Sequence, residues 1–138
     1  MVQEEDAVTL PLPITLASAS VLTLLSLVLA MRAAMVRVKY GILMGDGGNP
    51  DMLARMRAHA NFVEYVPLLL ILMGLLELSG ANRTMLMASS AALVLARVLH
   101  AIGMARPSPN PWRAAGTVGT TLLIVLYAGY GLVILILR

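Results

Sequence analysis

The chain has 138 residues, of which 59% are hydrophobic and only 12% are charged, and its mean hydropathy is +0.87. A soluble domain usually carries about 25% charged residues, so this composition excludes an ordinary soluble enzyme and predicts an integral membrane protein. The absence of cysteine excludes disulfides, a protein thiolate nucleophile and cysteine-ligated metals. The net charge of +3 is typical of basic loops beside a membrane, and we therefore expect no nucleic-acid partner.

The first apolar segment is expected to cross the membrane over residues 8–35. No charge interrupts residues 7–31, a stretch long enough to cross a hydrocarbon core of about 30 Å. A basic segment follows, and residues 41–51 are then rich in glycine and contain an Asn-Pro pair. No Gly-Lys-Ser/Thr closes this stretch, which favours a simple loop over a phosphate-binding loop.

Three further spans are expected over residues 55–78, 84–104 and 113–137. Asp51 is a candidate N-cap for the second helix, and Pro67 lies inside that helix, where neighbouring helices must satisfy the freed carbonyl. The fourth span carries small residues that would let another helix approach closely, namely Gly116, Gly119, Gly129 and Gly131. The sequence therefore predicts an all-α fold, in which residues 1–138 form a single transmembrane four-helix bundle.

Basic residues concentrate in two of the three connections between these spans. Residues 32–57 carry most of them, and Arg106 and Arg113 flank the third connection. The second connection has Arg83 alone, and residues 1–6 are acidic. By the positive-inside rule, the first and third connections face the cytoplasm and both termini face the opposite side of the membrane.

Polar side chains gather at the head of the second helix, over residues 55–67. At 3.6 residues per turn, Arg57, Asn61 and Glu64 share one face, whereas His59 points roughly the opposite way. A charge inside a membrane span costs at least about 2.5–3.5 kcal/mol, so each one needs a partner or a function. The sequence therefore places a candidate site at the cytoplasmic end of this helix.

The other three helices bring basic groups to a similar depth. Arg97 and His100 lie near the cytoplasmic end of the third span, Arg37 follows the first span, and Arg113 begins the fourth. Because the helices alternate in direction, these residues are all expected at the same end of the bundle as the polar face of the second helix.

Three interpretations of this cluster stay open on the residues alone. Glu64 could pair with Arg57 or Arg97 and simply tie helices together. The guanidinium groups, with an amide and a carboxylate, could instead bind an anionic, amide-bearing ligand. A proton relay through Glu64 and His100 is the third interpretation. His59 and His100 lie on different helices with one carboxylate nearby, so we expect no metal site.

The second helix also resembles a known family. The order Arg-x-x-x-Asn-x-x-Glu-Tyr-x-Pro is similar to the signature of membrane-associated proteins in eicosanoid and glutathione metabolism (MAPEG), and it is formed here by Arg57, Asn61, Glu64, Tyr65 and Pro67. The other basic positions and the glycine-rich loop resemble the small bacterial inner-membrane branch of that family. The resemblance covers nearly the whole chain.

The resemblance implies a homotrimer in the bacterial inner membrane that binds glutathione between subunits near the cytosolic face. It implies a glutathione transferase or peroxidase whose lipophilic substrate arrives from the bilayer between the first and fourth helices. Arg113 would stabilise the glutathione thiolate. The implied glutathione contacts are Arg37, Arg57, His59, Asn61, Glu64, Tyr65, Arg97 and His100.

Some positions depart from the branches of the family that form eicosanoids. Met104 stands where those enzymes usually have a tyrosine, and Ala114 and Thr117 replace the serine and tyrosine of one prostaglandin-forming branch. These differences argue against prostaglandin isomerase chemistry. One branch works as a lipid-binding adaptor, so the alternative is a non-catalytic lipid- or partner-binding membrane protein. A small transporter is a further alternative.

Overall fold

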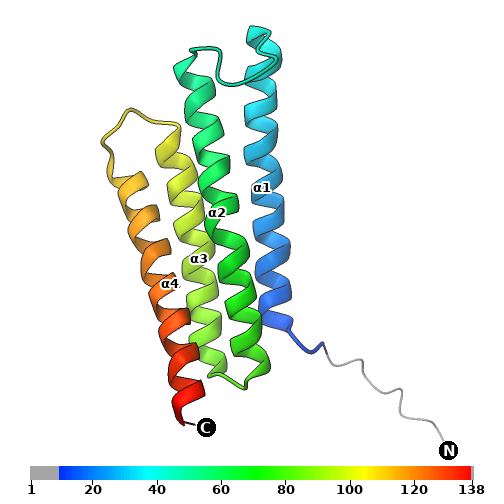
Figure 1. Ribbon diagram of the computed structural model, residues 1–138, viewed down its shortest axis with the longest axis vertical. Coiled ribbons are helices and arrows are strands. Elements are labelled where there is room, and N and C mark those ends of the chain that lie inside the picture. Colours follow the sequence, from blue (N-terminus) through cyan, green and yellow to red (C-terminus); the bar gives the residue numbers. More distant parts are fainter. Residues whose placement is uncertain (1–9, 138) are drawn as a thin grey trace, which may run out of the picture.

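Four long helices run side by side in alternating directions in the computed structural model, which describes residues 10–137 (Figure 1). They are α1 (Pro13–Tyr40), α2 (Pro50–Leu78), α3 (Arg83–Met104) and α4 (Pro111–Leu137). Each helix is long and apolar enough to cross a membrane. The expected all-α transmembrane bundle is thereby confirmed. Residues 1–6, whose acidic character entered the expected orientation, lie outside the described part of the chain.

The first helix includes described residues of the expected span 8–35 and extends beyond it; residues 8 and 9 of that span lie outside the described residues. It begins at Pro13 and continues to Tyr40, where Gly41 (φ 64°) takes the left-handed conformation that closes the helix. Arg37 and Lys39 lie in its last turn, where the helix dipole favours cations. Basic residues that end a hydrophobic stretch therefore do not end the helix itself.

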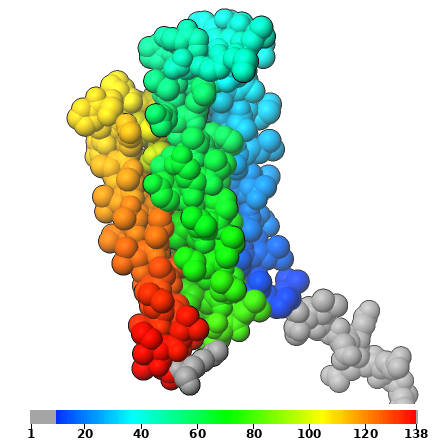
Figure 2. All heavy atoms as spheres, in the orientation of Figure 1, coloured from blue at the N-terminus to red at the C-terminus, as the bar shows by residue number. Residues whose placement is uncertain are grey.

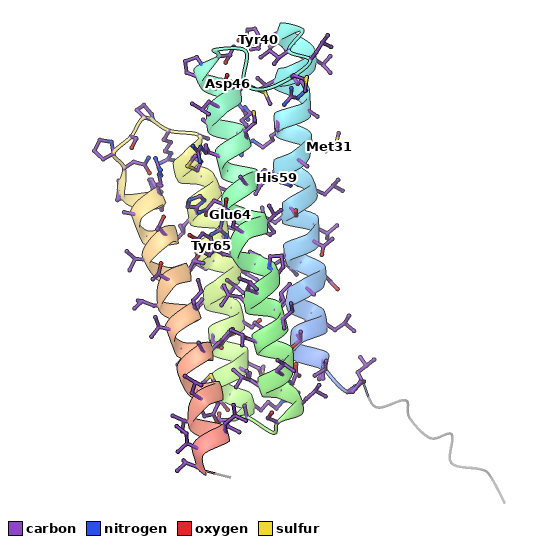
Figure 3. The ribbon with its side chains drawn as sticks, in the orientation of Figure 1. Met31, Tyr40, Asp46, His59, Glu64 and Tyr65 are labelled. Carbon is purple, nitrogen blue, oxygen red and sulfur yellow. The ribbon has the colours of Figure 1, made fainter. Side chains whose placement is uncertain are left out.

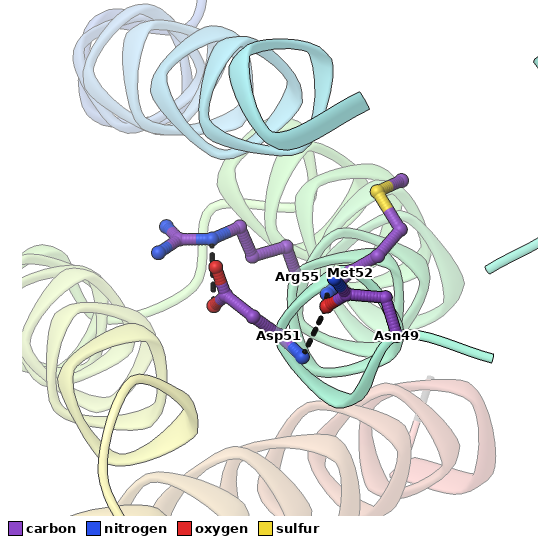
Figure 4. Close-up of polar contacts among 4 residues, drawn as sticks. All are labelled: Asn49, Asp51, Met52 and Arg55. Carbon is purple, nitrogen blue, oxygen red and sulfur yellow. Dashed lines mark hydrogen bonds and ion pairs between the residues drawn. The ribbon is translucent and has the colours of Figure 1, made fainter. Parts of the chain in front are cut away.

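The start of α2 corrects another expectation, because Asn49 and not Asp51 is its N-cap (Figure 4). The side-chain oxygen of Asn49 accepts hydrogen bonds from the backbone N–H groups of Asp51 (2.9 Å) and Met52 (3.1 Å). Asp51 lies in the first turn and pairs with Arg55 at 3.0 Å. Asparagine followed by proline is a strong helix-start signal, and it outranks the aspartate two residues later.

Helices α2 and α3 form the centre of the bundle. Helix α1 packs against α2 and α3, and α4 packs against the same two helices from the other side (Figure 1). Leu22, Leu69 and Leu93 are completely buried between them. Within residues 10–137, α1 and α4 do not pack against each other as neighbouring helices. An entry route for a lipophilic substrate between the first and fourth helices stays a prediction.

Helices α3 and α4 cross at close range because glycines face the partner backbone. A Cβ atom at Gly116 would lie 2.5 Å from the backbone nitrogen of His100, and one at Gly103 would lie 2.3 Å from that of Arg113. No side chain tolerates such distances, so this crossing requires glycine at both positions. The crossing also fixes how His100 and Arg113 sit relative to each other.

The glycines expected to admit a helix in α4 divide into two groups. Gly116 lets α3 approach closely, and a Cβ atom at Gly119 would lie 3.2 Å from the Cβ atom of Ala96 on α3. At Gly129 and Gly131, no described atom beyond the local backbone of α4 and the adjoining residues lies within 4 Å of such a Cβ atom. Within one chain no helix uses this space, and close approach of another helix at these two glycines stays a prediction.

Glu77, near the end of α2, caps the start of α1. Its carboxylate accepts hydrogen bonds from the backbone N–H groups of Ile14 (2.9 Å) and Thr15 (2.8 Å) and from the Thr15 hydroxyl (2.7 Å). The first N–H groups of a helix have no partner inside the helix, and its dipole favours a negative charge there. One side chain thus joins the two helix ends.

We expect Glu77→Gln to lower the free energy of unfolding by about 1–2 kcal/mol, because an amide offers one acceptor oxygen where the carboxylate offers two. Loss of helical circular dichroism on heating in detergent measures this change. Glu64→Gln is the matched control: it makes the same substitution on the same helix at an exposed side chain, and its effect should stay below about 0.5 kcal/mol. Equal effects of the two substitutions would contradict the capping role.

Candidate functional site

A cavity of about 550 Å³ opens between the start of α2, the end of α3 and the start of α4. The hollow is visible in Figure 2 between α2 and the yellow segment that links α3 to α4. We call this end of the bundle, where α1 and α3 finish, the pocket end. The volume lies within the range of small-molecule sites. The polar wall of the cavity consists of Arg57, Asn61, Glu64, His100, Arg106, Ser108 and Arg113.

One face of α2 contributes three of these side chains. Arg57, Asn61 and Glu64 are spaced by one helical turn each and line the same cavity. Figure 3 shows Glu64 and Tyr65 farther from the pocket end than His59 on this helix. The shared face expected from the helical period therefore exists in the structure, and it borders an open space rather than a packed neighbour.

Glu64 is exposed at the cavity. Within residues 10–137, the one ion pair is that between Asp51 and Arg55, so Glu64 pairs with neither Arg57 nor Arg97. The interpretation of Glu64 as an electrostatic tie between helices is therefore wrong inside a single chain. Its carboxylate is available to a ligand or to another subunit.

The start of α4 is positioned by Asn110. Its side-chain oxygen accepts a hydrogen bond from the backbone N–H of Arg113 (2.9 Å), and its amide nitrogen donates to the carbonyl of Gly103 (3.0 Å). Asn110 therefore caps α4 and joins it to the end of α3, which places Arg113 beside the cavity. This role was not predicted from the sequence, although asparagine before Pro111 repeats the helix-start signal seen in α2.

Arg106 adds a cation to the cavity wall, and it was not among the site residues predicted from the sequence. Its guanidinium carbon lies 5.1 Å from the centroid of the Trp112 ring, a distance that suits a cation–π contact. With Arg57 and Arg113, the wall holds three guanidinium groups against the single carboxylate of Glu64. The cavity is therefore suited to a ligand with a net negative charge.

Arg97 lies behind this wall and not in it. Its side chain is only 1% exposed. One terminal nitrogen, Nη2, donates to Oδ1 of Asn61 at 3.0 Å and lies 3.5 Å from Nδ1 of His100, while Nη1 donates to the Thr120 hydroxyl at 3.3 Å. The Phe62 ring centroid is 5.5 Å from the guanidinium carbon. The expected direct contact between Arg97 and a ligand in the large cavity is therefore not available in a single chain.

Three other predicted contacts lie away from the large cavity. Arg37 donates a hydrogen bond to the carbonyl of Ile42 (3.2 Å) and so stabilises the turn after α1. His59 is half-buried on α2 and does not line the cavity. Tyr65 lines a separate space of about 40 Å³ beside Arg97. Within one chain, the large cavity thus gathers Arg57, Asn61, Glu64, His100 and Arg113 from the predicted set.

The fold and the cavity define an integral membrane four-helix protein with a cation-rich pocket at one end of the bundle. The MAPEG family model matches residues 15–133. The chain is also 31% identical over 91 residues to the inner membrane protein YecN of Escherichia coli K12 and of Escherichia coli O6:H1 strain CFT073, which covers 66% of this chain and 69% of each relative. No solved structure matches the chain.

The chain therefore belongs to the MAPEG family. This confirms the resemblance that the motif on the second helix carried. Together with the four membrane-spanning helices, the similarity to an inner membrane protein makes it an integral inner-membrane protein of that family.

Proposed function

We propose that this protein is a membrane-bound glutathione transferase or peroxidase and that the large cavity holds glutathione. The polar wall carries this proposal, because it combines the guanidinium groups of Arg57, Arg106 and Arg113 with the carboxylate of Glu64. Glutathione has two carboxylates, one ammonium group and two amides. Each of its charges therefore has an opposite charge available in the wall, and guanidinium groups bind carboxylates through paired hydrogen bonds.

Arg113 is the proposed catalytic residue. A free thiol has a pKa of about 8.5, so most of it is protonated at neutral pH. A guanidinium group in the first turn of α4, together with the positive end of the helix dipole, favours the ionised thiolate of the bound glutathione. The thiolate is the nucleophile that both reactions need.

The two proposed reactions differ in the atom that the thiolate attacks. With a chlorinated nitroaromatic, sulfur bonds to the ring carbon that carries chlorine, and chloride leaves. With a lipid hydroperoxide, sulfur takes the terminal oxygen and leaves an alcohol. A second glutathione then displaces that oxygen as water and forms glutathione disulfide. In both cases the lipophilic substrate reaches the cavity sideways from the bilayer.

We further propose a homotrimer in which a neighbouring subunit closes each cavity. In such a trimer, Arg37 and His59 would reach the cavity of a neighbouring subunit, since they lie away from the cavity of their own chain. Membrane lipids would cover the remaining apolar surface. The pocket end would face the cytoplasm and both termini the periplasm, because residues 32–57 and the α3–α4 connection hold most of the basic residues.

Turnover by the purified protein tests the proposed function. We expect glutathione-dependent loss of a chlorinated nitroaromatic or of a lipid hydroperoxide, at a rate proportional to the amount of protein. Membranes from cells without the protein, purified in the same way, provide the control. The absence of turnover with both substrates, together with the absence of glutathione binding, would overturn the proposal.

A second candidate function is supported by a different cavity. A space of about 510 Å³ lies between α2 and α4 at the opposite end of the bundle, and its wall is almost entirely apolar, including Leu72, Leu76 and Leu132. Such a groove could hold an acyl chain, as a lipid-binding membrane protein without catalytic activity requires. In that case bound glutathione, if any, would show no thiolate absorbance in the ultraviolet.

A further inference from the structure

We propose that Arg97 is a positioning residue that sets which atoms the cavity wall presents to a ligand. It fixes the side-chain amide of Asn61 and the tautomer of His100, so that Asn61 Nδ2–H and His100 Nε2–H both face the cavity as donors. The orientation of the two side chains stands on the structure alone. The identity of the ligand that meets them rests on the proposed function.

The orientation of Asn61 follows from the chemistry of arginine. A guanidinium group donates hydrogen bonds and cannot accept them. Because Arg97 Nη2 lies 3.0 Å from the Asn61 side chain, the atom that faces it must be the oxygen. The amide nitrogen is then directed away from Arg97. Asn61 lines both the large cavity and the small space beside Arg97, and the proposal assigns its two N–H groups to the large cavity.

The same argument determines the protonation of His100. Arg97 Nη2 has a second N–H group, and it lies 3.5 Å from Nδ1 of His100. Since Arg97 must be the donor, Nδ1 must be the nitrogen without a proton. The imidazole is then neutral and carries its hydrogen on Nε2. His100 lines the same cavity as Asn61, which gives the wall a second donor.

Three helices hold Arg97 in the orientation that this role requires. Asn61 and Phe62 contact it from α2, and His100 from α3. From α4, the Thr120 hydroxyl donates its own hydrogen to the carbonyl of Gly116 (2.8 Å) and so presents a lone pair to Arg97 Nη1. Arg97 is 1% exposed, so its guanidinium has little freedom to turn.

The two donors assign a direction to the bound ligand. A carboxylate or amide carbonyl oxygen suits the space beside Asn61 and His100, whereas an ammonium group suits Glu64 in the same wall. In the proposed function, Arg97 would therefore select the acceptor groups of glutathione without touching them. A lysine cannot replace it, because a single ammonium on a flexible stem does not hold two acceptors in a fixed fork.

Nitrogen NMR of histidine in the full-length protein in detergent tests the proposal without any ligand. The chain has two histidines, so His59→Gln leaves His100 as the one signal source. We expect one protonated and one unprotonated ring nitrogen, with the proton on Nε2. Adding Arg97→Lys should move the two nitrogen signals toward each other, because both tautomers become populated. A proton on Nδ1 before that change, or unchanged signals after it, would overturn the proposal.

Ser89→Ala separates positioning from a general loss of packing. Ser89 lies on α3 and accepts a buried hydrogen bond from the Tyr127 hydroxyl of α4 (2.9 Å), so its loss disturbs the same helix pair without touching Arg97. We expect the His100 signals to stay unchanged in this variant. If they shifted as they do in Arg97→Lys, Arg97 would be only a structural tie. If Arg97→Lys does not fold, the signals measured with Arg97 intact can still overturn the proposal, because a proton on Nδ1 would contradict it.

A double-mutant cycle extends the test to the ligand. We expect Arg97→Lys alone to weaken glutathione binding about tenfold. In a His100→Ala background the further loss should be clearly smaller, because part of the effect of Arg97 passes through His100. Equal losses in both backgrounds would contradict that coupling. If the unaltered protein binds no glutathione, the proposed function fails, while the tautomer of His100 is still decided by NMR.

Discussion

Arg113→Ala should lower glutathione-dependent turnover by at least about 100-fold, which is the usual cost of losing a preorganised charge that stabilises a reacting anion. Binding of glutathione should fall far less, because Arg57 and Arg106 remain in the cavity wall. The bound thiol should also lose its thiolate absorbance. Steady-state rates with a chlorinated nitroaromatic and the ultraviolet spectrum of the complex measure both effects.

Two further variants distinguish this role from a general effect of charge. Arg113→Lys keeps the charge but loses the fork of donors, and we expect it to retain part of the activity. Arg83→Ala removes an exposed arginine at the opposite end of the bundle, and turnover should not change. Turnover that survives Arg113→Ala at the original rate would remove the catalytic role assigned to Arg113.

Gly116→Ala should disrupt the cavity by forcing apart α3 and α4, the two helices that carry His100 and Arg113. The added methyl group would lie 2.5 Å from the backbone nitrogen of His100 and 2.6 Å from the carbonyl oxygen of Ala96, and backbone atoms cannot move aside as a flexible side chain can. Helices α3 and α4 must then separate, at a cost of about 1–3 kcal/mol in the free energy of unfolding. Glutathione binding should weaken as well, because His100 and Arg113 line the cavity from these two helices.

Gly129→Ala is the matched control for this prediction. It makes the same substitution in the same helix, but a Cβ atom there meets no described atom within 4 Å beyond the local backbone of α4 and the adjoining residues. Alanine is the better helix former by about 1 kcal/mol, so stability should stay the same or rise. Thermal unfolding in detergent compares the two variants. If both unfolded like the unaltered protein, the close crossing of α3 and α4 would be contradicted.

The sequence predicted the parts of the molecule that depend on local patterns. Long stretches without charge predicted four membrane-spanning helices, and the 3.6-residue period predicted the shared face of Arg57, Asn61 and Glu64. Both kinds of signal are contained within a single helix. They need no knowledge of how the helices pack.

Features that depend on packing between helices could not be predicted in the same way. Arg97 was predicted to contact the ligand. Its burial behind Asn61 could not be predicted, because α2 and α4 together produce it. The roles of Gly103 and Glu77 were not predicted. Gly103 is required by the close approach of the start of α4, and Glu77 caps the start of α1. The N-cap residues Asn49 and Asn110, by contrast, carried a local signal that can be recognised in the sequence.

Calorimetric titration of the purified protein with glutathione shows whether the cavity binds this ligand through its one carboxylate. We expect saturable binding by the unaltered protein and at least about tenfold weaker binding by Glu64→Gln, which removes the partner of the ligand ammonium but leaves the fold intact. No heat of binding to the unaltered protein, or the same affinity in both proteins, would contradict the account.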